Sequence, residues 1–186
     1  MRKFTPFSKN IIFCDTEFSD LDIYSGEILS IGLIKYSGEE LYLELEHSGK
    51  TSDWMKENLP ELLISKNTIR KEDAKIKIRE FIGDTMPYLV AHVNQYDMAF
   101  WHKLFYGEEE PIHWLPIDFA SMLFACGINP EKGEDAEKKL EFYARLGIDH
   151  EKLRPHHALD DARLLREMFL ALEKKSLLKF FRKELL

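Results

Sequence analysis

The hydrophobic and polar positions of this 186-residue chain follow two patterns, one typical of strands and one of helices. The stretch "NIIFCDTEF" is apolar on both faces, which predicts a central strand. The turn residues Ser37-Gly38 predict an antiparallel hairpin between the next two apolar runs. Strands are predicted at 10–18, 28–36, 40–46, 87–93 and within 113–119.

Apolar residues spaced three and four apart predict helices at 71–84, 94–105, 121–126, 134–146 and 158–174. The tail "SLLKFFRKELL", about 176–186, predicts a further amphipathic, basic helix. We expect this tail to pack on the parent domain or on a second subunit, which allows a homodimer, rather than on a membrane surface. Three strands followed by alternating helices and strands predict an α/β fold, a mixed five-stranded sheet flanked by helices, in one domain over 1–186.

The last helix raises a question about its own acidic residues. Its apolar stripe consists of Ala158, Ala162, Leu165, Phe169 and Leu172. At about 100° per residue, Asp160 lies nearly opposite this stripe, while Asp161 lies only about 60° from its centre. We therefore expect Asp160 to be solvated and Asp161 to face the core.

Three more carboxylates occupy positions that the pattern predicts to be partly buried. The strand period of two puts Asp15 and Glu17 on the same face as Ile11 and Phe13, with the two carboxylates about 6.5–7 Å apart along the strand. Asp97 lies in the first turn of the helix after the fourth strand, where open α/β sheets usually bind ligands.

Each acid alone has an ordinary structural explanation, such as a turn cap, an exposed strand end, a favourable helix-dipole position or an ion pair with an arginine. Four semi-buried carboxylates without a matching set of buried basic residues are costly together, because they lose hydration and repel one another. Divalent cations with oxygen ligands remove both costs. Since no cysteine or histidine cluster accompanies the acids, the set predicts Mg²⁺ or Mn²⁺ rather than structural zinc.

Composition and charge narrow the choice of partners. A hydrophobic share of 45% with 12% aromatic residues is that of an ordinary globular domain. The net charge of −7 argues against a grip on long duplexes, yet it allows a small site for a few nucleotides if metal ions supply positive charge. No membrane-spanning or signal-peptide segment is predicted, so we expect a cytoplasmic protein. Cys14 and Cys126 are too few for a disulfide framework, and Cys14 is expected to be a reduced core residue.

Three motifs carry a family resemblance. "FCDTEF" with Asp15 and Glu17, "AHVNQYD" with Asp97, and "HHALDDA" with His156 and Asp161 resemble the exonuclease motifs of the DEDDh group. These are the DnaQ-like 3′→5′ exonucleases of the ribonuclease H-like fold. The motifs stand in the family order, and "DTEF…ILSIGLI" is similar to a small bacterial exoribonuclease-like branch. The resemblance implies a ribonuclease H-like mixed sheet in a single DEDDh exonuclease domain, and it allows a polymerase-type partner.

The resemblance also implies the chemistry. Two Mg²⁺ or Mn²⁺ ions held by Asp15, Glu17, Asp97 and Asp161, with Asp15 shared, would serve the hydrolysis of single-stranded RNA or DNA from its 3′ end to nucleoside 5′-monophosphates. His156 would act as the general base on the attacking water. Phe18, Thr16 and Asn94 are the expected substrate contacts, with core packing as an equal alternative for Phe18. Two departures from the family pattern affect these contacts. The Asn of the second motif stands one position later here, as Asn94, because Val93 intervenes. The glycine that many relatives carry shortly after the Glu of the first motif is absent after Glu17.

The tandem histidines require a choice between two arguments. On a continuous helix, residues four apart lie about 40° from each other and residues five apart about 140°, so helix geometry alone favours His157. The family spacing places its histidine five residues before the aspartate, in a loop ahead of the helix, which implies His156. Pro155 supports a chain break at this point. His157 is then expected to be a solvated neighbour.

Rival functions from other classes are consistent with the same residues. A non-catalytic exonuclease-like module would bind nucleic acid or a polymerase without cutting. A metal-dependent hydrolase would act on short oligonucleotides or nucleotides only. A pure divalent-cation binder is disfavoured, because the acids lack the 12-residue loop arrangement of an EF-hand.

Overall fold

The computed structural model describes residues 6–129 and 136–184, with side chains for 6–129, 140–149 and 151–175. The strands are β1 (Ile11–Phe18), β2 (Ile28–Lys35), β3 (Glu40–Glu44), β4 (Tyr88–Ala91) and β5 (Ile117–Asp118). The helices are α1 (Asp53–Asn58), α2 (Pro60–Leu63), α3 (Lys71–Ile82), α4 (Gln95–Leu104), α5 (Phe119–Ala125), α6 (Ala136–Leu146) and α7 (Ala158–Glu184). A 3-10 turn, η2 (His150–Lys152), precedes α7.

The strands form one mixed sheet in the order β3-β2-β1-β4-β5. The central strand β1 is antiparallel to β2 and parallel to β4. The β2–β3 hairpin extends the antiparallel half, and β5 extends the parallel half. This α/β arrangement is consistent with the ribonuclease H-like topology, and it confirms the fold class predicted from the sequence.

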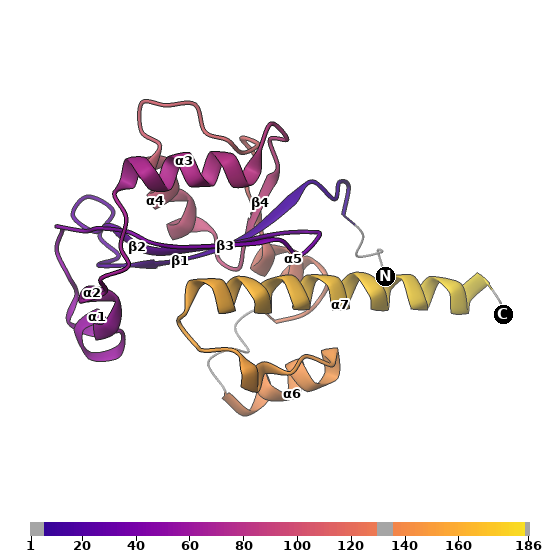
Figure 1. Ribbon diagram of the computed structural model, residues 1–186. Coiled ribbons are helices and arrows are strands. Elements are labelled where there is room, and N and C mark those ends of the chain that lie inside the picture. The colour runs from indigo at the N-terminus through magenta and orange to yellow at the C-terminus, as the bar shows by residue number, and fades with distance from the viewer. Residues whose placement is uncertain (1–5, 130–135, 185–186) are drawn as a thin grey trace.

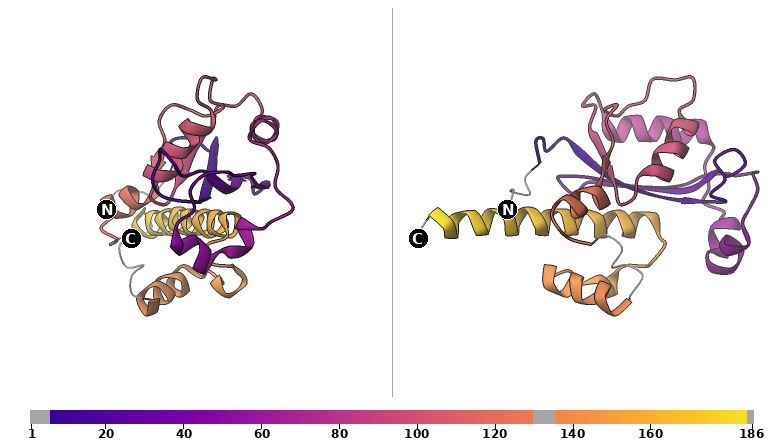
Figure 2. Two further views of the ribbon diagram at one scale, coloured as in Figure 1. Left: turned by 90° about the vertical axis from the view of Figure 1, so that its left-hand side faces the viewer. Right: turned by 180° about the vertical axis from the view of Figure 1, so that it is seen from behind.

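Helices cover both faces of the sheet. Figure 1 shows α3 and α4 on one face and the long helix α7 along the other, with α6 beyond it. Figure 2 shows the same layers from the side and from behind. Two hydrophobic clusters fill the spaces between the layers, one under α3 and α4 and one under α5, α6 and α7.

The alternation of β1 decides which layer each of its residues faces. Ile11 and Phe13 belong to the cluster under α7, where the Phe13 ring meets Phe169 edge-on with centroids 5.2 Å apart. Because successive side chains point to opposite faces, Asp15 and Glu17 follow on the α7 face. The apolar start of the strand therefore fixes the position of both carboxylates.

Cys14 points to the other face and is a free, buried cysteine in the cluster under α3 and α4. Burial raises the pKa of its thiol well above the usual value, and the neighbouring Asp97 and Asp15 raise it further. A neutral thiol packs like a small apolar side chain. This confirms the expectation of a reduced core cysteine.

Gly32 of β2 allows α7 to begin directly on the sheet. A Cβ atom at Gly32 would lie 2.3 Å from the carbonyl oxygen of Ala158, far inside contact distance. Gly32 also pairs with Asp15 across the β1–β2 ladder. The missing side chain therefore places the first turn of α7 over the part of β1 that carries the carboxylates.

Two short helices, α1 and α2, occupy a region where the hydrophobic pattern predicted no element. A hydrogen bond from the Met55 N–H to the Ser52 hydroxyl caps α1, and Pro60 begins α2. Helices of one or two turns are too short to show a clear 3.6-residue period. They add a small core of Leu29, Met55, Leu59 and Leu62.

The helix α7 is longer than predicted, because it continues without a break from Ala158 through Glu184. The prediction of a separate tail helix at 176–186 is therefore wrong, because residues 176–184 continue α7. The helix does not end at the predicted boundary, since neither Lys175 nor Ser176 is a helix breaker. Residues 134, 135, 185 and 186 of the predicted helices lie outside the described residues. Across the part of the chain that is described, no helix is both long and apolar enough to cross a membrane.

Candidate metal centre

Asp15 and Glu17 occupy the carboxyl-terminal half of β1, and both are partly buried. The β1–β2 register becomes irregular between Glu17 and Phe18. Irregularities of this kind redirect the chain beside functional sites. The pairing with β2 thus changes register directly after the second of the two carboxylates.

Asp97 reaches the same edge of the sheet from α4. The strand β4 runs parallel to β1, so their carboxyl ends meet at one edge, and α4 begins shortly after β4. Asp97 is only 8% exposed, and its Oδ1 accepts a 2.6 Å hydrogen bond from the Thr16 hydroxyl. Thr16 lies between Asp15 and Glu17 in sequence, so this bond ties α4 to the strand that carries them.

Asp161 arrives from the first turn of α7, where its N–H donates to the carbonyl of His157 at 3.0 Å. Ligand atoms of Glu17, His156 and Asp161 all lie within 4.8 Å of one another. The end of β1 and the start of α7, which are distant in sequence, thus meet at one point.

The electrostatics of the carboxylates show that all four share one environment. Burial raises the pKa of Asp15 well above its usual value, and Asp97, Asp161 and Glu17 raise it further. Burial, then Asp161 and Asp97, raises the pKa of Glu17 to about 8. Burial also raises the pKa of Asp97 to about 6, against the lowering effect of the Thr16 hydrogen bond. Asp15 and Glu17 thus feel other carboxylates as nearby like charges.

The donor set fits a hard divalent cation. The candidate ligand atoms are carboxylate oxygens of Glu17 and Asp161 and an imidazole nitrogen of His156, a set in which oxygen donors predominate, as Mg²⁺ and Mn²⁺ prefer. The nearby thiol of Cys14 lies on the opposite face of the sheet, so it adds no soft ligand. Positive charge at this point would favour the ionised forms that burial and mutual repulsion now disfavour.

His156 lies in the loop before α7, as the family spacing implied. It is exposed and its backbone has a φ of +57°, the left-handed conformation that costs a non-glycine residue roughly 1–3 kcal/mol. Its ring meets Trp54 of α1 edge-on, with centroids 5.2 Å apart. The sequence pattern did not place Trp54 near the site. Ser52 followed by Asp53 is a helix-start signal and would have predicted a short helix that carries Trp54.

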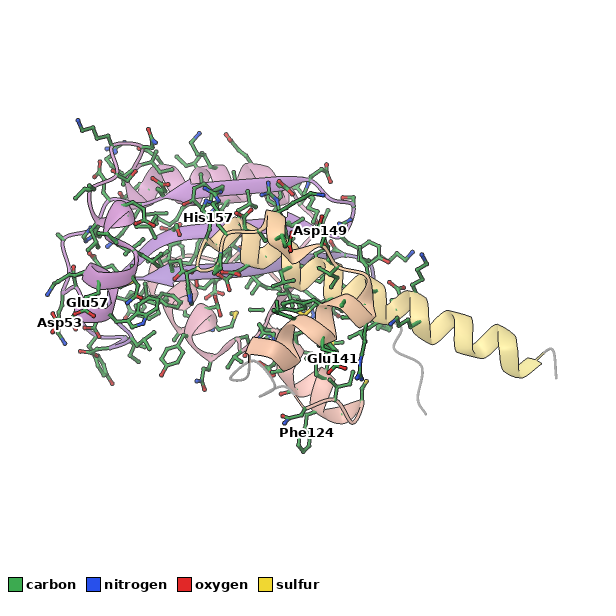
Figure 3. All side chains as sticks on the ribbon, turned by 90° about the horizontal axis from the view of Figure 1, so that it is seen from below. Asp53, Glu57, Phe124, Glu141, Asp149 and His157 are labelled. Atoms are coloured by element: carbon green, nitrogen blue, oxygen red, sulfur yellow. The ribbon has the colours of Figure 1, made fainter. Side chains whose placement is uncertain are left out.

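His157 is not the solvated neighbour that we expected. Its ring stacks on Tyr42 of β3 with centroids 4.5 Å apart, and Figure 3 shows it beside the start of α7. Burial and then the charge of Arg154 lower its pKa. Arg154 Nη2 lies 2.8 Å from His157 Nε2, and because a guanidinium only donates, this ring nitrogen accepts.

Asp160 also contradicts our expectation, since it is 3% exposed rather than solvated. Its Oδ2 accepts hydrogen bonds from the Arg154 backbone N–H and Nε, at 3.3 and 2.8 Å, and its Oδ1 pairs with Arg163. Burial acts to raise the pKa of Asp160, but these bonds outweigh it and leave the pKa below its usual value. The helix angles predicted that Asp160 points away from the apolar stripe of α7. They did not predict that the loop containing Arg154 folds back over this side chain.

The three expected substrate contacts have different surroundings. Phe18 stacks on Phe100 with centroids 4.3 Å apart, which is the core-packing alternative. Thr16 is buried and donates its hydroxyl to Asp97, so its side chain supports a carboxylate. Asn94 directly precedes α4 as its capping residue, and its backbone N–H donates to Asp118 at 3.0 Å.

Comparison of the sequence with models of known protein families gives no match, and comparison with curated proteins gives none either. The resemblance to the DEDDh exonucleases therefore rests on the three motifs alone. The chemistry of the site must be inferred from its own geometry and charge.

Proposed function

We propose that this protein is a metal-dependent 3′→5′ exonuclease that releases nucleoside 5′-monophosphates from single-stranded nucleic acid. The observation that carries the proposal is the grouping of Glu17, His156 and Asp161, whose ligand atoms lie within 4.8 Å of one another, beside Asp15, whose pKa is raised by the charges of Asp97, Asp161 and Glu17. Such a cluster of like charges disfavours the folded state unless a cation offsets it. The order of the three DEDDh-like motifs supports the same conclusion.

Asp15, Glu17, Asp97 and Asp161 would hold two Mg²⁺ or Mn²⁺ ions. When bound, these ions would supply the positive charge that stabilises the attacking and leaving oxygens of an in-line displacement at phosphorus. The pKa of Asp15 responds to all three other carboxylates, which favours it as the shared ligand.

The helix ends help to keep the carboxylates ionised. Asp97 lies in the first turn of α4 and Asp161 in the first turn of α7. The amino-terminal end of a helix carries partial positive charge and stabilises nearby anions. Both helices therefore direct favourable dipoles at the cluster.

His156 would accept the proton of the attacking water. A histidine suits proton transfer near neutral pH, and this one has a ring nitrogen within 4.8 Å of ligand atoms of Glu17 and Asp161. Its exposure allows the proton to pass to solvent afterwards. Trp54, 47% exposed beside it, offers an aromatic face to an unpaired base, which favours single-stranded substrates.

The test is a time course on 5′-labelled single-stranded RNA and DNA of matched sequence, in Mg²⁺, in Mn²⁺ and in EDTA. We expect a ladder that shortens from the 3′ end, release of 5′-monophosphates, and no reaction in EDTA. Substrates that stay intact in both metals would overturn the proposal. Asp53→Asn is a matched control, because Asp53 pairs with Lys56 at 2.8 Å on the exposed face of α1 (Figure 3).

Substrate length separates the rival functions. A hydrolase of nucleotides or very short oligonucleotides would act on mononucleotides and dimers but leave longer strands uncut. A non-catalytic module would bind the labelled strand in Mg²⁺ without shortening it.

A further inference from the structure

The loop that carries His156 is hydrogen-bonded to Asp160, an aspartate outside the candidate metal centre. Asp160 accepts hydrogen bonds from both the backbone N–H and the guanidinium of Arg154, two residues before His156. Its other oxygen pairs with Arg163, which also donates to Glu40 of β3 at 2.9 and 2.6 Å. A chain of charges thus runs from the loop, through α7, to the sheet.

A second contact fixes the other side of the same loop. His157 stacks on Tyr42 of β3, and its Nε2 meets Arg154. Tyr42 is itself held by a 3.0 Å hydrogen bond from its hydroxyl to Glu44. The residues on both sides of His156 are therefore anchored to β3 and to α7.

His156 is left with little conformational choice. Its backbone adopts the left-handed conformation, and its ring lies near Glu17, Asp161 and Trp54. A side chain in a sparsely populated backbone conformation keeps it only where the surroundings impose it. Asp160 and its partners are those surroundings.

Two adjacent aspartates have thus divided their roles. Asp161 belongs to the metal centre, whereas both oxygens of Asp160 are occupied by arginine groups and one backbone N–H. An exposed ion pair contributes little, but Asp160 is 3% exposed, and it joins residues on either side of His156. A helix cap alone would not need two guanidinium groups.

We infer that Asp160, acting through Arg154, is a positioning residue that aims His156 at the reacting centre. The inference rests on the proposed exonuclease function. A displacement of about 1 Å in a catalytic group can cost roughly a hundredfold in rate. Asp160 therefore controls the rate without touching substrate or metal.

The first experiment measures kcat, KM and Mn²⁺ affinity of Asp160→Asn, with Asp53→Asn as the matched control. We expect a tenfold to hundredfold fall in kcat with KM and Mn²⁺ affinity unchanged, and no change in the control. An Asp160→Asn variant with the wild-type kcat, or with weakened Mn²⁺ binding, would overturn the inference.

A double-mutant cycle with His156→Asn separates positioning from general damage. Asparagine tolerates the left-handed conformation, so this variant removes the imidazole while keeping the loop. If Asp160 acts only through His156, Asp160→Asn lowers kcat no further in the His156→Asn background. An equal loss in both backgrounds contradicts positioning.

An NMR measurement stands apart from catalysis. The wild type should give a nuclear Overhauser effect between the Trp54 indole and the His156 ring, and Asp160→Asn should lose it. An unchanged effect contradicts the inference even if the protein degrades no nucleic acid, so the two failures are distinguishable. Should Asp160→Asn not fold, Arg154→Gln tests the same link, because the Arg154 side chain is 68% exposed.

Discussion

Glu17 and Glu27 lie at the two ends of one loop, yet the protein treats their carboxylates in opposite ways. Burial acts to raise the pKa of Glu27, but a hydrogen bond from Lys71 and two bonds from backbone N–H groups, these two each 2.7 Å long, outweigh it and lower the pKa to about 2. Burial and two neighbouring carboxylates raise the pKa of Glu17 to about 8. Glu27 closes a loop, whereas Glu17 faces other carboxylates and, in the proposed function, binds a cation.

The same contrast separates the candidate metal centre from other charged groups of the protein. Beside α3, Lys75 and Arg79 both pair with Glu108, so these charges are neutralised within the protein. At the candidate metal centre, Asp15 and Glu17 face other carboxylates instead. Stability is locally sacrificed where function is proposed, and this is the pattern expected of active sites.

The largest effect should come from removing the carboxylate at the centre of the acidic cluster. We expect Asp15→Asn to lower exonuclease kcat at least ~1,000-fold, because it removes the ligand shared by both proposed ions. The measurement is the initial rate on a single-stranded oligonucleotide in Mg²⁺ and Mn²⁺. A variant that keeps a tenth of the wild-type rate would contradict the metal assignment.

The two histidines should differ strongly. We expect His156→Asn to lower kcat by about 100-fold to 10,000-fold, the range for loss of a general base. His157→Ala should lower it about tenfold or less, because it loosens the loop while leaving the imidazole of His156 in place. Rates measured for both variants decide the choice, and the reverse order would move the catalytic role to His157.

A Cβ atom at Gly32 should separate α7 from the sheet. Gly32→Ala places a methyl group against the backbone of Ala158, and overpacking of this kind costs about 1–3 kcal/mol. Urea unfolding measures the loss. Activity should fall more than stability alone explains, since α7 carries Asp161 and follows His156; a variant that is destabilised yet fully active would contradict this.

The comparison of Glu17 and Glu27 predicts that replacing each with Gln changes the free energy of unfolding in opposite directions. The pKa of Glu17 rises from 4.5 to about 8 on folding, so the metal-free protein loses stability as pH rises through that window. The pKa of Glu27 falls from 4.5 to about 2, so its contribution is present above 4.5 and is lost as pH falls toward 2. At pH 8 in EDTA, Glu17→Gln should stabilise and Glu27→Gln destabilise, each by about 2 kcal/mol.

Urea unfolding at pH 5 and pH 8, with EDTA or Mn²⁺, checks this prediction. Mn²⁺ should remove the advantage of Glu17→Gln, because the wild type alone gains the full binding free energy. Equal signs for the two variants would refute the contrast between the two glutamates.

The sequence predicted the strands and the acidic positions because both depend on local periodicity. The alternation that placed Ile11 and Phe13 inside also placed Asp15 and Glu17 on the α7 face. The end of β4 likewise indicated Asp97. These positions can be read from the sequence of single elements, and the fold then brings the carboxylates together.

The contacts that depend on a loop folding back were not predictable in this way. Asp160 has the angle of a solvated residue, but Arg154 covers it from a segment without periodicity. Trp54 reaches His156 from a helix of two turns. Such pairings are set by tertiary packing, which spacing within one element does not encode.

Cys14 gives the strand of the proposed metal ligands a chemical reporter. Its thiol is 1% exposed, so an alkylating reagent reaches it only when β1 detaches from its neighbours. In a Cys126→Ser background, the alkylation rate at Cys14 would follow these openings directly. The ratio of the alkylation rates with and without Mn²⁺ then measures how much a bound cation reduces the opening of β1.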